Sequence, residues 1–107
     1  MNSKSAPKKK EKIKLPLLPD YTGAFKKDWT RLERSGRYDM ARLKAVMLDL
    51  IADVTPLDAA RRDHVLQGNW QDYRECHIGG DFLLIYQKTD TTIVFVRTGS
   101  HADLFEN

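Results

Sequence analysis

The sequence lacks the features that would place it outside a reducing cell interior. Cys76 is its only cysteine, so no disulfide can form within the chain, which fits the cytoplasm. No apolar run approaches the roughly 20 residues that span a bilayer, and residues 82–86 form a stretch only of strand length. The basic N-terminus is not followed by an apolar signal core. We therefore expect a cytoplasmic protein without membrane contact, in which Cys76 is a small core side chain.

The chain also lacks a phosphate-binding glycine loop, paired cysteines and internal repeats. Its basic character is confined to one end: residues 1–14 hold six Lys and one Glu, a net charge of +5, whereas residues 15–107 hold 12 basic and 14 acidic residues, a net charge of −2. We interpret residues 1–14 as a flexible basic leader and residues 15–107 as one domain. The leader could attract nucleic acid non-specifically or simply aid solubility.

Apolar periodicity predicts two helices after a short extended or edge segment at residues 13–19, whose two prolines exclude a central strand. Thr22 can cap the first helix, which ends near Ser35 before Gly36. Asp39 can cap the second, and Pro56 follows its end. The short link between them predicts a helical hairpin. The apolar stripes expected to face the core are Phe25, Trp29 and Leu32, and then Met40, Leu43, Val46, Met47, Leu50, Ile51 and Val54.

The second half of the chain changes to the period of strands. Residues 56–69 read as a loop with one helical turn around residues 58–62. Strands are expected at residues 71–78, 82–87 and 92–98. The first two are joined at Gly79-Gly80, and Gly99 ends the third. The order predicts an α+β domain with the helical hairpin packed on one face of a small antiparallel sheet.

All three histidines fall in this second half, each beside polar and aromatic residues. Histidine titrates near neutrality and therefore moves protons with little tuning. The hairpin brings His77 close to Asp81, and Tyr73, Glu75 and His77 share one strand face. Whether Arg97 points to that same face depends on the strand register, which the sequence leaves open. A cleft that holds His64, His77, Asp81, Arg97 and His101 is geometrically reasonable.

Three sequence blocks carry a family resemblance from about residue 15 to residue 105. They are Asp63-His64-x-Leu-x-Gly-x-Trp70, Tyr73-Arg74-x-x-His77-x-x-x-Asp81 followed by Leu-Ile-Tyr, and Arg97-Thr98-Gly99-x-His101-x-x-Leu104-Phe105. With this order and spacing the chain resembles the YafQ branch of the RelE-like toxins of bacterial type II toxin–antitoxin systems. The departures are Val65 in place of an expected proline and the lysine-rich leader.

The resemblance implies the RelE-like microbial RNase fold and a ribosome-dependent endoribonuclease that cuts mRNA without a metal or other cofactor. It also implies a cognate antitoxin and operator DNA bound through the toxin–antitoxin complex. The functional set carried over is His64, His77, Asp81, His101 and Phe105. Metal-free RNA cleavage needs a base for the 2′-hydroxyl, an acid for the 5′-oxygen and cations at the phosphate. We expect His101 and Asp81 to transfer protons, and His64 and His77 to position substrate or share that work.

Further residues could complete an RNA site. Arg97 and Arg74 could hold the phosphate, although Arg97 could instead only pair with a carboxylate. Phe105 offers a face for a splayed base, and Trp70 is a second aromatic candidate that could equally be a loop anchor.

Three other functions compete with cleavage. His64, His77, Asp81 and His101 could form a zinc site, but no two of these histidines have the close spacing of common zinc motifs. The chain could be a catalytically silent module that binds an antitoxin and corepresses operator DNA, or a plain interaction domain. The complete His and Asp set favours cleavage.

Overall fold

The computed structural model describes residues 15–106, and the predicted leader at residues 1–14 lies outside the described residues. Five strands form one sheet in the order β2-β6-β5-β4-β3. The strands are β2 (Leu18–Tyr21), β3 (His64–Val65), β4 (Arg74–Gly79), β5 (Phe82–Lys88) and β6 (Thr92–Gly99). The helices are α1 (Gly23–Ser35), α2 (Met40–Ile51) and α3 (His101–Phe105), with single 3-10 turns at η2 (Ala59–Arg61) and η3 (Gly68–Trp70). The expected α+β class is confirmed.

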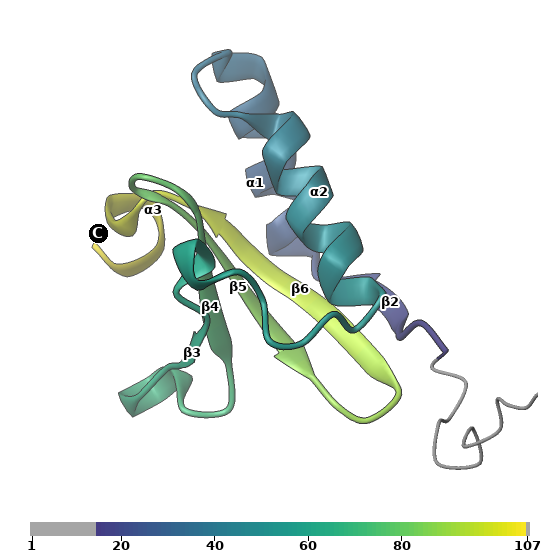
Figure 1. The fold of residues 1–107 in the computed structure, drawn as a ribbon. Coiled ribbons are helices and arrows are strands. Elements are labelled where there is room, and N and C mark those ends of the chain that lie inside the picture. The colour runs from purple at the N-terminus through teal and green to yellow at the C-terminus, as the bar shows by residue number, and fades with distance from the viewer. Residues whose placement is uncertain (1–14, 107) are drawn as a thin grey trace, which may run out of the picture.

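The helical hairpin forms as the capping residues predict. The Thr22 hydroxyl accepts a hydrogen bond from the Phe25 N–H at the start of α1, and Gly36 ends the helix with a left-handed φ of 69°. The Asp39 carboxylate caps α2 by accepting from the Arg42 N–H. Figure 1 shows α1 and α2 lying together along one side of the sheet. Two expectations about the stripes were wrong. Asp28 is buried on α1 while Trp29 is only partly covered, and Val54 follows the end of α2 and is 45% exposed.

The sheet is larger than the predicted three-stranded meander and is not purely antiparallel. The expected edge segment forms β2, which pairs in parallel with β6 from Leu18 opposite Thr92 to Tyr21 opposite Phe95. Pro19 is tolerated there because an edge strand leaves one row of N–H groups without a strand partner. β3 adds a short antiparallel strand at the other edge, within the segment predicted as a loop. Its partner β4 begins at Arg74, three residues later than predicted, because η3 and a turn occupy residues 68–72.

One local prediction was wrong beside the site, the position of the turn between β4 and β5. Gly79 pairs with Phe82, so the two-residue turn consists of Gly80 and Asp81 rather than Gly79 and Gly80. Gly80 supplies the positive φ, 55°, that this turn needs. The tail after Gly99 forms α3, which a capping box at Ser100 begins.

Each face of the sheet carries its own core. The helix-side core includes Cys76, Leu84 and Phe95, and a smaller cluster of Leu83, Ile85 and Leu104 lies on the other face. Cys76 is fully buried, and burial raises the pKa of its thiol to about 12, which confirms it as a core side chain. Between residues 15 and 106, no helix combines the length and apolar character needed to cross a membrane.

Candidate active site

Strand register decides which polar side chains meet. Glu75 is directly opposite His64 on one side and Ile85 on the other, and Ile85 is in turn opposite Arg97. Because directly opposed residues share a sheet face, His64, Glu75 and Arg97 lie on the same face, and His77 joins them two residues after Glu75. This is the face away from the helical hairpin. The register that the sequence left open therefore places Arg97 with the histidines.

A buried carboxylate joins two of the histidines. Glu75 Oε1 lies 3.1 Å from His64 Nε2 and 3.9 Å from His77 Nε2. The Glu75 side chain is only 5% exposed, whereas that of His64 is 50% exposed. The three side chains form the only cluster among residues 15–106 whose ligand atoms fit one metal ion, all within 4.8 Å of one another. Two imidazole nitrogens and a carboxylate oxygen are a donor set that can hold a transition-metal ion.

The third histidine forms a separate pair with Asp81 at the same end of the sheet. Asp81 Oδ1 lies 2.6 Å from His101 Nδ1 and also accepts the backbone N–H of His101 at 3.0 Å. These two hydrogen bonds, the backbone one foremost, lower the pKa of the Asp81 carboxyl, with a smaller electrostatic effect from His77. Since Nδ1 faces Asp81, Nε2 is the ring nitrogen of His101 that remains for proton transfer.

The lowered pKa of Asp81 predicts the pH range in which its contact with His101 stabilises the fold. The folded-state pKa is below the ordinary Asp value of about 3.9, so the stabilisation from the contact is present above that value. It is lost as the pH falls through the lowered folded-state pKa. We expect an NMR titration of the Asp81 carboxyl carbon to show this lowered pKa. The His101→Ala variant should raise it only part of the way, because the backbone donor remains; an unchanged pKa would contradict the ring contact.

A row of aromatic rings begins beside the His101 ring. The Phe105 ring lies 5.9 Å from the His101 ring and 5.9 Å from that of Trp70, which in turn contacts Tyr73 at 5.5 Å. Phe105 is 40% exposed, while Trp70 packs against the small core of this face. Phe105 therefore presents a ring to solvent beside His101, and Trp70 supports it from the side.

Arg97 is already paired with a carboxylate. Its Nε and Nη2 donate to Asp28 Oδ2 and Oδ1 at 2.6 and 3.1 Å, and these bonds raise the pKa of Arg97. Its Nη1 donates no hydrogen bond within residues 15–106, and the side chain is 28% exposed. The pairing fixes the plane of the guanidinium and leaves one nitrogen for another partner.

The two arginines predicted to hold the phosphate, Arg97 and Arg74, lie on opposite faces of the sheet. Arg74 is opposite Tyr86, which belongs to the helix-side core. Its Nη2 donates to Asp63 Oδ2 at 3.1 Å, and the Tyr86 hydroxyl donates to the same carboxylate. Arg74 therefore lies on the opposite face from Glu75 and His77, and its predicted contact with a substrate phosphate stays a prediction.

The structure thus brings together His64 with His77, and Asp81 with His101, Phe105 and Trp70, at one end of the sheet. It adds two carboxylates that sequence reasoning did not include in the site. Glu75 was recognisable from its alternation with His77 on a strand. Asp28 was recognisable only as a polar residue three positions after Phe25, inside an apolar stripe.

Known proteins resemble this chain over nearly all of its described length. The sequence model of the family "Bacterial toxin of type II toxin-antitoxin system, YafQ" matches residues 17–106. The mRNA interferase toxin YafQ of Escherichia coli K12 is 44% identical over 86 residues, which cover 80% of this chain and 92% of that protein.

Solved structures agree with the sequence comparison. The crystal structure of the Escherichia coli DinJ-YafQ toxin-antitoxin complex contains a chain with 42% identity and a TM-score of 0.77, covering 85% of this chain and 99% of that one. A metal-bound toxin from Helicobacter pylori has 37% identity and a TM-score of 0.74, covering 83% of this chain and 99% of that one.

Proposed function

The chain belongs to the YafQ family of bacterial toxins from type II toxin–antitoxin systems, and from this premise we propose that it is an mRNA endoribonuclease. Its relative in Escherichia coli is named an mRNA interferase. The observation that carries the proposal is the Asp81–His101 pair, joined at 2.6 Å, on the same end of the sheet as His77. This arrangement supplies titratable groups for proton transfer together with a fixed cation, Arg97.

The reaction requires two proton transfers at one phosphodiester. A base takes the proton of the 2′-hydroxyl, whose oxygen attacks phosphorus; the P–O5′ bond breaks, and an acid gives a proton to the departing 5′-oxygen. We assign these transfers chiefly to His101 and Asp81. His64 and His77 position the substrate or share the work. Asp81 orients the His101 ring through the contact with Nδ1, which leaves Nε2 toward the substrate.

Arg97 and Phe105 serve substrate binding in this proposal. The free Nη1 of Arg97 can donate to a phosphoryl oxygen while Asp28 holds the rest of the guanidinium. Phe105 can stack on an unpaired base, which is how proteins commonly bind single-stranded RNA. The carboxylate of Glu75 holds the His64 ring through the 3.1 Å contact with Nε2 and lies 3.9 Å from His77 Nε2 on the same face.

The partners follow from the family. The chain has a cognate antitoxin as its protein partner, since a similar toxin is solved in complex with DinJ. We further propose that the ribosome presents the mRNA, and that the toxin–antitoxin complex binds operator DNA. The ribosome supplies substrate orientation in this scheme, so the free protein should cleave naked RNA poorly.

Induced expression in bacterial cells tests the function. We expect growth arrest and mRNA 5′-ends phased with codons, both suppressed by co-expression of the antitoxin. A folded protein that leaves growth and mRNA 5′-ends unchanged would overturn the proposal. It would instead favour a silent toxin-fold module that acts through antitoxin binding and operator corepression.

The His64–Glu75–His77 cluster supports a second property, reversible binding of a transition-metal ion. Ligand atoms around a tetrahedral zinc ion lie about 3.4 Å apart, given bonds of roughly 2.0–2.1 Å, and the contacts of Glu75 measure 3.1 and 3.9 Å. Imidazole suits Zn²⁺ and Cu²⁺, and a carboxylate oxygen is a known zinc ligand. The relative from Helicobacter pylori is described as metal-bound. This cluster differs from the predicted zinc set, because His101 and Asp81 form their own pair.

A binding experiment separates this property from catalysis. We expect calorimetry with Zn²⁺ or Cu²⁺ on untagged protein to show one ion per chain, and Glu75→Gln or His64→Ala to weaken binding by at least about 10-fold. His101→Ala is the matched control and should bind like wild type. A bound ion should slow mRNA cleavage, because it occupies the imidazole nitrogens of His64 and His77. Equal affinity in His64→Ala would contradict this site.

A further inference from the structure

A carboxylate occupies a position on α1 where the apolar stripe predicts a hydrophobic side chain. Asp28 is 5% exposed and lies between Phe25 and Leu32, the two other buried residues of α1. A buried charge is costly unless hydrogen bonds compensate it, and an apolar side chain of similar size often stabilises a fold as well or better. The burial of Asp28 therefore points to a requirement other than core packing.

Asp28 accepts four hydrogen bonds from three partners. Two come from Arg97, one from Arg31 Nη2 at 3.2 Å, and one from the backbone N–H of Thr98 at 3.1 Å. The Thr98 contact has a structural cause, because β2 pairs with β6 only as far as Phe95. Past Phe95, β6 is no longer paired with β2, and the Asp28 carboxylate accepts the Thr98 N–H in place of a strand carbonyl. All acceptor positions of the Asp28 carboxylate are thereby used.

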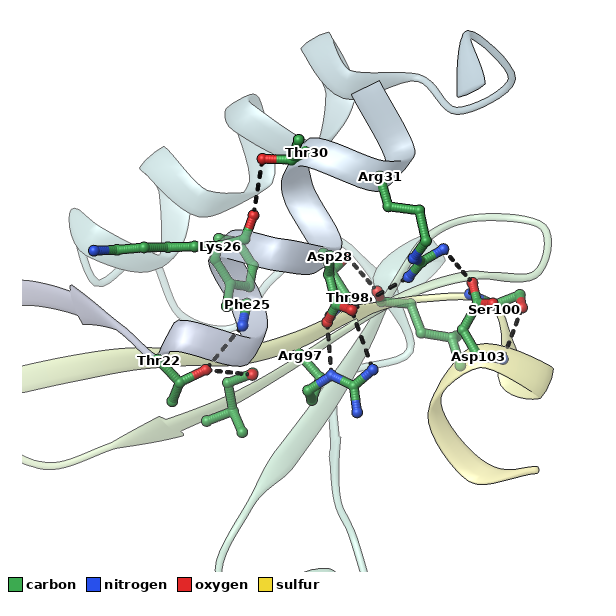
Figure 2. Close-up of polar contacts among 12 residues, drawn as sticks. Thr22, Phe25, Lys26, Asp28, Thr30, Arg31, Arg97, Thr98, Ser100 and Asp103 are labelled. Atoms are coloured by element: carbon green, nitrogen blue, oxygen red, sulfur yellow. Dashed lines mark hydrogen bonds and ion pairs between the residues drawn. The ribbon is translucent and has the colours of Figure 1, made fainter. Parts of the chain in front are cut away.

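Arg31 extends this network to the helix that carries His101. Its Nη1 donates to Asp103 Oδ2 at 3.2 Å, and the same oxygen accepts the Ser100 N–H at 3.0 Å in the capping box of α3. Figure 2 shows Arg31 reaching from α1 toward Asp103 and Ser100, with Asp28 between Arg31 and Arg97. Burial alone would raise the pKa of Asp103, but the Ser100 N–H and Arg31 outweigh it and lower that pKa.

We propose that Asp28 and Arg31 are positioning residues for mRNA cleavage, which hold Arg97 and α3 in one fixed arrangement. Asp28 sets the orientation of the Arg97 guanidinium by binding Nε and Nη2, which leaves Nη1 for the substrate phosphate. Arg31 donates to both Asp28 and Asp103 and so connects the start of α3 to the Asp28 carboxylate. This helix carries His101 and Phe105. Neither residue touches the reacting atoms. The inference rests on the proposed endoribonuclease function and identifies which residues outside the site maintain its geometry.

Single-turnover cleavage of a defined mRNA on purified ribosomes tests this role, with the toxin in excess and varied in concentration. We expect Asp28→Asn to lower the maximal rate constant about 10- to 100-fold, the loss typical of a misplaced catalytic group. The toxin concentration at half-maximal rate should change little, because Asp28 is only 5% exposed and the substitution leaves the exposed surface unaltered. A purely structural role would instead lower the melting temperature and leave the rate per folded molecule unchanged.

A matched control and a double-mutant cycle sharpen the test. Asp53→Asn breaks the 2.6 Å Asp53–Lys88 ion pair at the far end of β5 and should cleave like wild type; the left-handed φ of 61° at this position suits asparagine. If Asp28 acts through Arg97, combining Asp28→Asn with Arg97→Met should lower the rate constant little beyond Arg97→Met alone. Fully multiplicative losses would overturn the assignment of Asp28.

The outcomes separate the inference from the function on which it rests. A wild type that does not cleave ribosome-bound mRNA overturns both. A cleaving wild type with an equally fast, folded Asp28→Asn overturns the inference alone. If Asp28→Asn fails to fold, Arg31→Met decides, because the Arg31 side chain is 46% exposed. Arg31→Met should lower the rate constant several-fold without unfolding the protein. An unchanged rate would overturn the inference that Arg31 positions α3.

Discussion

The His101→Ala variant is expected to lose mRNA cleavage by a factor of about 100 to 10,000, the usual contribution of a general acid or base. Two features make this the largest catalytic effect among the three histidines. Of the three histidines, His101 has the shortest contact with a carboxylate, 2.6 Å from Asp81, and its ring borders the exposed Phe105. The substitution removes both the titratable nitrogen and the partner of Asp81.

The measurement is the single-turnover rate constant on mRNA-programmed ribosomes, alongside growth after induction. Stability should change little, because the His101 side chain is 54% exposed and the capping contacts of α3 come from Ser100 and Asp103. Circular dichroism of the purified variant checks the fold. Cleavage within about 3-fold of wild type would remove His101 from the proton-transfer step and shift it to His64 or His77.

The Gly99→Ala variant is expected to lose about 2–3 kcal/mol of folding free energy and most of its cleavage activity. Gly99 has a φ of 151°, which side chains rarely adopt, and an added Cβ would lie 2.7 Å from Asp103 Oδ2 and 3.0 Å from Asp103 Cβ. The Asp103 side chain must then move. A lost helix cap costs about 0.5–2 kcal/mol, and an unfavourable φ adds roughly 1–2 kcal/mol.

The loss of activity follows from the same displacement. Asp103 Oδ2 accepts the Ser100 N–H and a hydrogen bond from Arg31, so moving it releases the start of α3, where His101 is placed. Urea unfolding gives the change in stability, and ribosome-dependent cleavage of the folded protein gives the change in rate. Gly80→Ala is the comparison, since its added Cβ meets nothing within 4 Å although its φ is 55°. Equal effects of the two substitutions on cleavage would contradict the role of Asp103.

Local features were predictable because they depend on residues close in sequence. Thr22, Gly36 and Asp39 set the limits of the helical hairpin through caps that reach at most three residues. The hairpin between β4 and β5 was predicted one residue early, since Gly79 and Gly80 are both acceptable turn residues and only the pairing of Gly79 with Phe82 distinguishes them. The resemblance to known toxins also depends on local motifs.

The residue types of the site were likewise evident from the sequence, but their grouping was not. One cleft was expected to hold all three histidines with Asp81 and Arg97. The structure instead separates a His64–Glu75–His77 cluster from the Asp81–His101 pair. The pairing of Asp81 with His101 depends on α3, a five-residue helix too short to show apolar periodicity.

The sequence by itself determined the caps, the helix stripes, the turn glycines and the presence of three histidines, because each depends on a few neighbouring residues. Only the tertiary structure decided that Arg97 shares a face with Glu75, that Arg74 does not, and that Asp28 holds Arg97. The side chains of Asp28 and Arg97 meet across 69 positions of the chain. Such contacts follow from strand register and helix packing, which are set by the combined burial of many distant residues rather than by any local pattern.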